Sequence, residues 1–156
     1  MSYDIDLYIP VAGEDPKVTA RKDNDFDASL SDEARDRNQL AILALKAFNQ
    51  ELEVFEFKTG VQITAPNDGT GISIELFNNC GAVTVPYWHD TEAERVIGLI
   101  SEYLKIVHTA AGFDAYDPQS ETVLYPEAGF ELSPVMYSIG VNGLSSATRK
   151  PWWKFW

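Results

Sequence analysis

The chain has 156 residues, of which 45% are hydrophobic and 23% are charged. This length and composition are typical of one globular domain and exclude a disordered or fibrous chain. Twenty-four acidic residues face twelve basic ones, so the formal net charge is −12. Such a surface repels nucleic acid and attracts basic partners, although acidity can also serve solubility alone.

Features that would place the chain in a membrane or an oxidising compartment are missing from its sequence. Cys80 is the single cysteine, so no internal disulfide is possible. Residues 1–6 lack the basic and apolar regions of a signal peptide. No apolar run approaches the roughly 20 residues of a membrane span. We therefore expect a cytoplasmic protein without integral membrane association.

The first predicted element is a strand over residues 3–9, where apolar side chains occupy every second position. This period of two is typical of a strand with one buried face, and Pro10 ends it. Residues 11–30 are polar and irregular, so they predict a long loop.

The next predicted element is a helix over residues 32–51. Ser29 or Ser31 can cap it, and Asp32 and Glu33 then lie in the first turn, where the helix dipole favours acids. Apolar residues follow at helical spacing in two stripes, and an arc this wide predicts a well-buried helix. The first stripe is Leu40, Leu43, Ala44, Ala47 and Phe48, and the second is Ile42, Leu45 and Leu52.

Four β-prone segments follow. Residues 53–57 and 61–64 predict two short strands, and residues 66–69 form a turn signal. Residues 72–77 and 82–88 predict a hairpin whose loop, residues 78–81, contains Cys80.

The second predicted helix carries clear signals at both ends. Thr91 and Glu94 fit a capping box. Apolar residues recur at positions i, i+3 and i+4 from Val96 to Val107. Gly112 stands where such a helix would end.

Two more short strands, at residues 113–116 and 122–125, complete an α+β pattern. The short connections between the middle strands favour a mainly antiparallel sheet with two helices packed on one face. We therefore expect a single α+β domain over residues 1–126. Residues 127–156 are expected to form an irregular C-terminal extension that ends in a basic, Trp-rich tail.

The sequence contains no complete metal-binding or cofactor-binding motif. Residues 23–27 resemble the start of a calcium loop, but Ala28 and Ala34 stand where that loop requires Gly and Glu. The two histidines are not at the spacing of metal ligands, and no phosphate-binding or nucleophile motif is present. We expect no metal and no cofactor.

One group of side chains has the residue types of an acid–base site. A small hydrolase-like enzyme would place its site near His89, Asp90 and Asp117. Residue types alone support that alternative, because such residues more often cap helices or face solvent. We therefore expect a binding protein, not an enzyme.

Several short segments resemble small acidic bacterial proteins that act as immunity proteins of polymorphic toxin systems. These segments are residues 85–88 (VPYW), 112–119 (GFDAYDPQ) and 151–156 (PWWKFW), together with the opening MSYD. The resemblance implies a cytosolic, non-catalytic protein that binds and neutralises a cognate toxin domain, often one that attacks nucleic acid.

The acidic charge is compatible with that role. A nuclease domain carries a basic surface for phosphate contacts, and an acidic inhibitor would be steered to it. The candidate partner-binding residues are one contiguous set of acids and a set of aromatic anchors. They are Asp23, Asp25, Asp27, Asp32, Glu33 and Asp36, with Tyr87, Trp88, Trp152, Trp153 and Trp156.

The C-terminal octapeptide at residues 149–156 leaves three interpretations open. It holds three Trp, one Phe and three basic residues. These side chains can pack into the domain's own core, or they can anchor another protein. They can also dock the protein on a membrane or a larger assembly, where Trp and Lys are favoured. The partner's identity and the oligomeric state stay open.

Overall fold

The computed structural model describes residues 2–22, 27–86, 92–130 and 132. Seven strands and three helices form the described chain, with one short 3₁₀ turn. The strands are β1 (Ser2–Tyr8), β2 (Glu53–Phe57), β3 (Gly60–Thr64), β4 (Ser73–Leu76), β5 (Cys80–Pro86), β6 (Asp114–Asp117) and β7 (Thr122–Leu124). The helices are α1 (Pro16–Ala20), α2 (Asp32–Phe48) and α3 (Ala93–Ala111), and the 3₁₀ turn is η1 (Pro126–Ala128).

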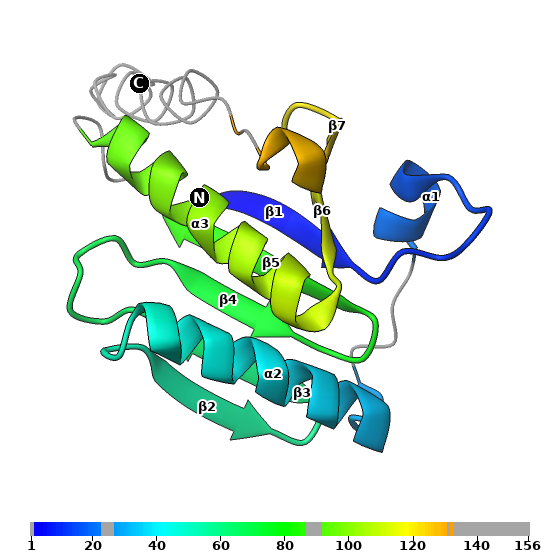
Figure 1. The fold of residues 1–156 in the computed structure, drawn as a ribbon, viewed down its shortest axis with the longest axis horizontal. Coiled ribbons are helices and arrows are strands. Elements are labelled where there is room, and N and C mark those ends of the chain that lie inside the picture. Colours follow the sequence, from blue (N-terminus) through cyan, green and yellow to red (C-terminus); the bar gives the residue numbers. More distant parts are fainter. Residues whose placement is uncertain (1, 23–26, 87–91, 131, 133–156) are drawn as a thin grey trace, which may run out of the picture.

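All seven strands belong to one antiparallel sheet in the order β2-β3-β4-β5-β1-β6-β7. Helices α2 and α3 lie side by side across one face of this sheet (Figure 1). The predicted α+β class, with a mainly antiparallel sheet and two helices on one face, is confirmed.

The core lies between this sheet and the two long helices. Its centre is a row of four side chains that runs across four paired strands: Ile63, Ile74, Val83 and Ile5. Each is at most 1% exposed. Burying one such side chain stabilises the fold by about 1.5–3 kcal/mol. The period-two pattern of the sequence therefore identified the buried face of the central strands.

Helix α2 begins as predicted but ends three residues early. Ser31 is its N-cap residue, and the Ser31 hydroxyl accepts a hydrogen bond from the backbone N–H of Ala34 at 3.1 Å. The last helical residue is Phe48, not residue 51, and the backbone N–H of Asn49 donates to the Leu45 carbonyl at 2.8 Å.

Helix α3 differs from its prediction at the start and agrees with it at the end. Its N-cap residue is Glu92, not Thr91, and its first helical residue is Ala93. Thr91 itself lies outside the described residues. Gly112 ends the helix in the left-handed conformation, at φ 72°, which glycine adopts without strain.

A short helix stands where the sequence predicted only loop. Asp15 caps α1 by accepting a hydrogen bond from the Lys17 backbone N–H at 2.8 Å, and Pro16 occupies the first turn. The residues of α1 cover a second, smaller apolar cluster, which consists of Tyr8, Ala20, Tyr116 and Val123. Residues 15–20 therefore do more than connect β1 to α2.

Cys80 is in strand β5, not in the hairpin loop where the sequence placed it. The loop is shorter than predicted, because β4 ends at Leu76 and β5 begins at Cys80. The thiol is 6% exposed, and burial, with a smaller effect of the nearby Asp6 carboxylate, raises its pKa to about 11. A thiolate is the reactive form of cysteine, so this thiol is poorly suited to act as a nucleophile.

The core continues past residue 126, the expected end of the domain. Phe130 and Leu132 are 1% and 9% exposed and belong to the main core. The Ser101 hydroxyl of α3 donates to the Phe130 carbonyl at 3.1 Å and holds this segment against the helix. The Trp-rich tail lies outside the described residues.

The close approach of β4 and β5 gives a testable consequence. A Cβ atom on Gly81 would lie 2.3 Å from the Glu75 carbonyl oxygen, which is backbone and cannot swing aside. We expect Gly81→Ala to destabilise the protein by about 1–3 kcal/mol, measured by urea unfolding. Gly98→Ala, in α3 with nothing within 4 Å, should instead stabilise it by about 0.5–1 kcal/mol. Equal unfolding midpoints for the two variants would contradict this packing.

Candidate functional site

The first half of α2 presents acids to solvent. Asp32, Glu33 and Asp36 are all exposed, and Asp27 is exposed just ahead of the helix. Residues three and four apart lie on the same side of a helix, so Asp36 stands next to the two acids of the first turn. Four of the predicted partner-binding residues are therefore at the surface, and three of them share one helix face.

Exposed apolar side chains continue this face along the second half of α2. Leu40, Leu43 and Phe48 are 55%, 59% and 51% exposed, and Ala47 is exposed between them. Leu40, Leu43 and Ala47 follow Asp36 at spacings of four, three and four residues, which keeps them on the outer side of the helix. The Phe48 ring instead packs edge-on against Tyr103 of α3, with 5.8 Å between the ring centres. The prediction that this stripe is buried was wrong.

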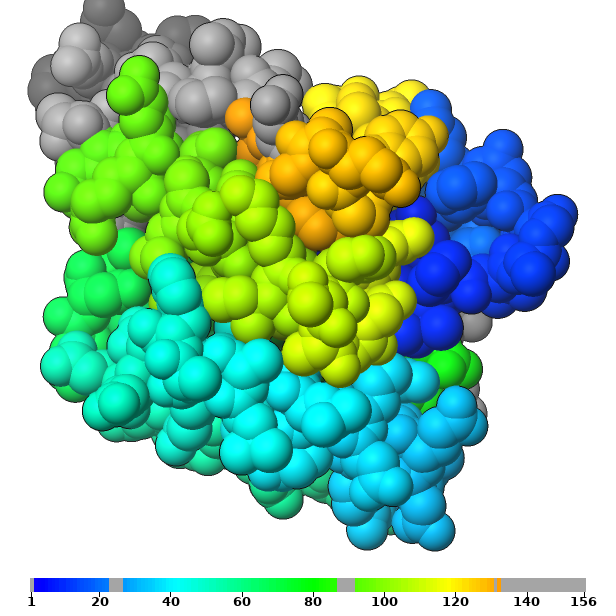
Figure 2. Space-filling model, in the orientation of Figure 1, coloured from blue at the N-terminus to red at the C-terminus, as the bar shows by residue number. Residues whose placement is uncertain are grey.

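A different arc of α2 faces the core. It consists of Ala34, Asn38, Ala41, Ile42 and Leu45. Because this arc is buried, the opposite side of the helix, which carries Leu40, Leu43 and Ala47, faces solvent. Figure 2 views the molecule from the helix side, where α2 (cyan) runs beside α3 (yellow-green). We call the set Asp32, Glu33, Asp36, Leu40, Leu43 and Ala47 the outer face of α2.

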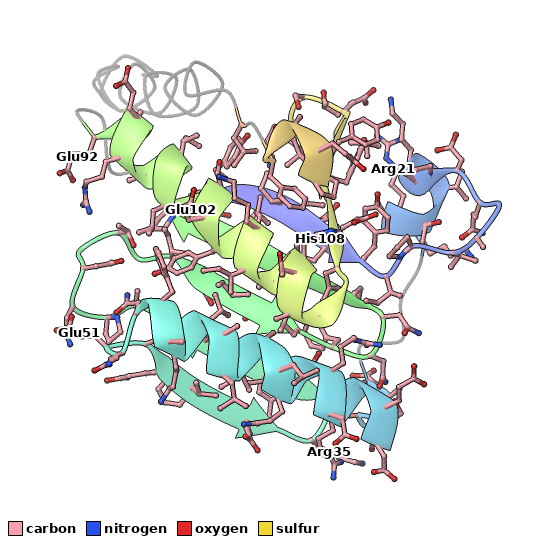
Figure 3. The ribbon with its side chains drawn as sticks, viewed as in Figure 1. Arg21, Arg35, Glu51, Glu92, Glu102 and His108 are labelled. Atoms are coloured by element: carbon pink, nitrogen blue, oxygen red, sulfur yellow. The ribbon has the colours of Figure 1, made fainter. Side chains whose placement is uncertain are left out.

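A groove borders the outer face on the side of β2. Its volume is about 750 Å³, within the range of ligand-binding pockets. The lining comes from α2, from strands β2 and β3 and from the residues just before α2. The groove is lined by Ser29, Leu30, Arg35, Asp36, Asn38, Gln39, Ile42, Glu56, Phe57, Lys58, Gly60 and Val61. Arg35 lies where the first half of α2 passes the end of β2 (Figure 3).

The charged groups of this groove are not paired with one another. The Arg35 guanidinium donates a long hydrogen bond, 3.5 Å, to the Leu30 carbonyl. Among the residues that the structure describes, Asp36 and Glu56 form no ion pair. The two carboxylates are therefore available to a positive group from outside the chain.

Asn38 is the buried polar side chain of the groove. It is 2% exposed, and its amide nitrogen donates to the Phe77 carbonyl at 3.2 Å. Its carbonyl oxygen has no hydrogen-bond partner within the described part of the chain. An unpaired buried acceptor costs about 1–3 kcal/mol, so this oxygen favours a donor supplied by a ligand or by water.

Asp117, one of the three acid–base candidates, is held by internal hydrogen bonds. The side chain is 2% exposed. One carboxylate oxygen accepts from the Tyr3 hydroxyl at 2.7 Å and from the Ser120 hydroxyl at 2.8 Å. The other accepts from the backbone N–H groups of Gln119 at 2.8 Å and Ser120 at 3.3 Å. These contacts tie the β6–β7 turn to β1, and they give Asp117 a structural task.

The remaining predicted site residues lie outside the described residues. They are Asp23, Asp25, Tyr87, Trp88, His89, Asp90, Trp152, Trp153 and Trp156. Within the described ranges, no three or more His, Cys, Asp or Glu side chains gather into a group that could hold a metal ion. No helix among the described residues is long and apolar enough to cross a membrane.

In comparisons with protein-family models, with curated proteins and with solved structures, nothing matches this chain.

The hydrogen bonds of Asp117 predict a large stability effect. Asp117→Ala removes all four acceptor contacts and leaves the Tyr3 hydroxyl buried without this partner. We expect a loss of about 2–4 kcal/mol in the free energy of unfolding. Tyr3→Phe removes one contact and should cost about 1 kcal/mol. Thermal unfolding followed by circular dichroism measures both, and equally small losses would show that Asp117 does not anchor the turn.

The two sides of α2 should respond differently to substitution. Leu43→Ser lies on the outer face and should change stability by less than about 0.5 kcal/mol. Leu45→Ala, at a fully buried position two residues on, should cost about 2–5 kcal/mol. Urea unfolding of the full-length chain measures both. Similar costs for the two variants would mean that another part of the protein covers Leu43.

Proposed function

We propose that this protein acts by binding another protein through the outer face of α2, and that the partner is a toxin domain with a basic surface. The observation that carries the proposal is the continuity of the acids with the exposed leucines on one helix face. Exposed apolar side chains that adjoin one another mark interaction sites more often than single ones do.

Each half of the outer face supports a different part of binding. The acids, on a chain of net charge −12, would attract a basic partner from a distance and speed association. The apolar half would supply the contacts that keep the complex together, because desolvated side chains near the centre of an interface contribute most of its affinity.

Neutralisation follows from binding without any chemistry by this chain. A domain that cleaves nucleic acid exposes basic side chains for phosphate. Carboxylates of the outer face would form ion pairs with those basic side chains and so block the binding of nucleic acid. The segments that resemble immunity proteins of polymorphic toxin systems support the toxin as the partner class.

A growth assay in a bacterial host tests the proposal. The open reading frame next to the gene of this protein is expressed alone and together with it. We expect the neighbour to arrest growth alone and this protein to restore growth. A neighbour that is harmless, or one that arrests growth regardless, would contradict the toxin-neutralising role.

Surface variants then locate the binding site. The double variant Leu40→Ser with Leu43→Ser, and separately Asp36→Lys, should each weaken binding to the toxin at least about tenfold, because hot-spot contacts contribute 1–2 kcal/mol or more. Matched controls are Val18→Ser, at an equally exposed position of α1, and Glu127→Lys in η1. Calorimetric titration measures the dissociation constants. Equal effects of variants and controls would place the interface elsewhere.

A further inference from the structure

We propose that the groove between α2 and β2 takes an extended peptide segment of the partner, which adds to the sheet at β2 and inserts a Lys or Arg side chain. This inference rests on the proposed function, because it states how the partner would bind. Three independent observations support it: the open edge, the groove and the unpaired Asn38 acceptor.

Strand β2 is an outer strand of the sheet, with β3 as its single neighbour. Four of its five residues are exposed, and two of them, Phe55 and Phe57, are large and apolar. An outer strand presents backbone N–H and C=O groups that another strand can pair with. Recognition by strand addition uses this feature: backbone bonds supply affinity and side-chain pockets supply specificity.

The pairing register indicates which backbone groups face outward. A two-residue turn joins β2 to β3, and it closes on the paired residues Phe57 and Gly60. A turn of this kind closes with a hydrogen-bonded pair, and such pairs alternate along an antiparallel ladder. The N–H and C=O groups of Val54 and Glu56 are therefore expected to point away from β3, toward an added strand.

The side chain of Glu56 connects this edge to the groove. Glu56 pairs with the buried Val61 and lies on the helix side of the sheet, and both residues line the groove. Asp36 lines the groove from α2. A strand added at β2 would thus run along the mouth of the groove, with two carboxylates within it.

The chemistry of the groove favours a basic side chain as the occupant. Asp36 and Glu56 have no ion pairs among the described residues. Asn38 lines the groove, and its buried carbonyl oxygen has no partner among the described residues, so a small shift of this side chain would present an acceptor to the groove. An ammonium or guanidinium group carries donors and no acceptor. Arg35 and Lys58 line the same groove and would repel a basic group close to them, so the charge of the occupant is expected beside Asp36 and Glu56. The apolar stem of a long basic side chain can pack on Ile42 and Leu30.

A library of displayed random peptides, about twelve residues long and panned on the full-length protein, tests this inference without knowledge of the partner. We expect enriched peptides to alternate β-branched or aromatic residues with polar ones and to carry Lys or Arg. A synthetic peptide of the enriched sequence should protect the amides of Val54 and Glu56 from hydrogen exchange. Replacing its basic residue with norleucine should weaken binding about tenfold.

Two substitutions of Glu56 distinguish the contribution of its charge to peptide binding from the contribution of its backbone N–H group. Glu56→Gln removes the carboxylate and should weaken peptide binding severalfold. Glu56→Pro also removes the outward N–H group, a change that edge strands tolerate, and should weaken binding at least about tenfold. Val18→Ser, at an exposed position of α1 outside both the outer face and the groove, should leave the affinity of the isolated peptide unchanged. Circular dichroism checks that each variant is folded.

The outcomes overturn or support the inference independently of the growth assay. No enriched peptide, no protection of the β2 amides, or equal binding to the Glu56→Pro variant would overturn it. Amide protection is measured on the unsubstituted protein, so it decides the matter even if Glu56→Pro fails to fold. Peptide binding at β2 without growth rescue would contradict the toxin as partner but would still support a strand-addition site at β2.

Discussion

The contact between α2 and the sheet determines where this protein has a free surface. The helix buries a narrow arc that includes the small residues Ala34 and Ala41, and its close backbone neighbour is α3. A helix of this kind buries only part of its circumference. The other apolar residues of α2 therefore lie outside the core. The groove forms between α2 and the outer strands β2 and β3.

Polar contacts fix this position of α2. The Asn38 amide and the Arg37 guanidinium both donate to backbone carbonyls near the β4–β5 loop, at Phe77 and Asn78 respectively. The Arg37 guanidinium also lies 5.2 Å from the centre of the Phe113 ring, and burial lowers the pKa of this arginine. Charged and amide groups are costly to bury unless they are paired, so these bonds favour one register of the helix over its alternatives.

The sequence predicted those parts of the fold that local patterns decide. The alternation of apolar residues identified the central strands, and Ser31 and Gly112 marked helix ends through their capping chemistry. A local signal for α1 was also present and was missed, because Asp15 followed by Pro16 is a typical helix start. Periodicity alone could not distinguish the two apolar arcs of α2, since both recur at helical spacing.

What decides the candidate site is non-local. The position of β2 at the edge follows from the strand order, in which the first strand of the chain is inserted between β5 and β6. No short segment encodes that order. The acids of α2 were recognised from their place at a helix start, whereas Leu40 and Leu43 were assigned to the core because apolar residues usually lie there. Their exposure became visible only once the sheet had selected the opposite arc.

The two ends of the sheet differ, and this has a consequence for self-association. At one end stands β2 with five residues, and at the other stands β7 with only three. A continuous fibre requires each molecule to pair at both edges. The three residues of β7 offer few backbone groups to a second strand. The asymmetry of the sheet therefore disfavours continued growth through both edges.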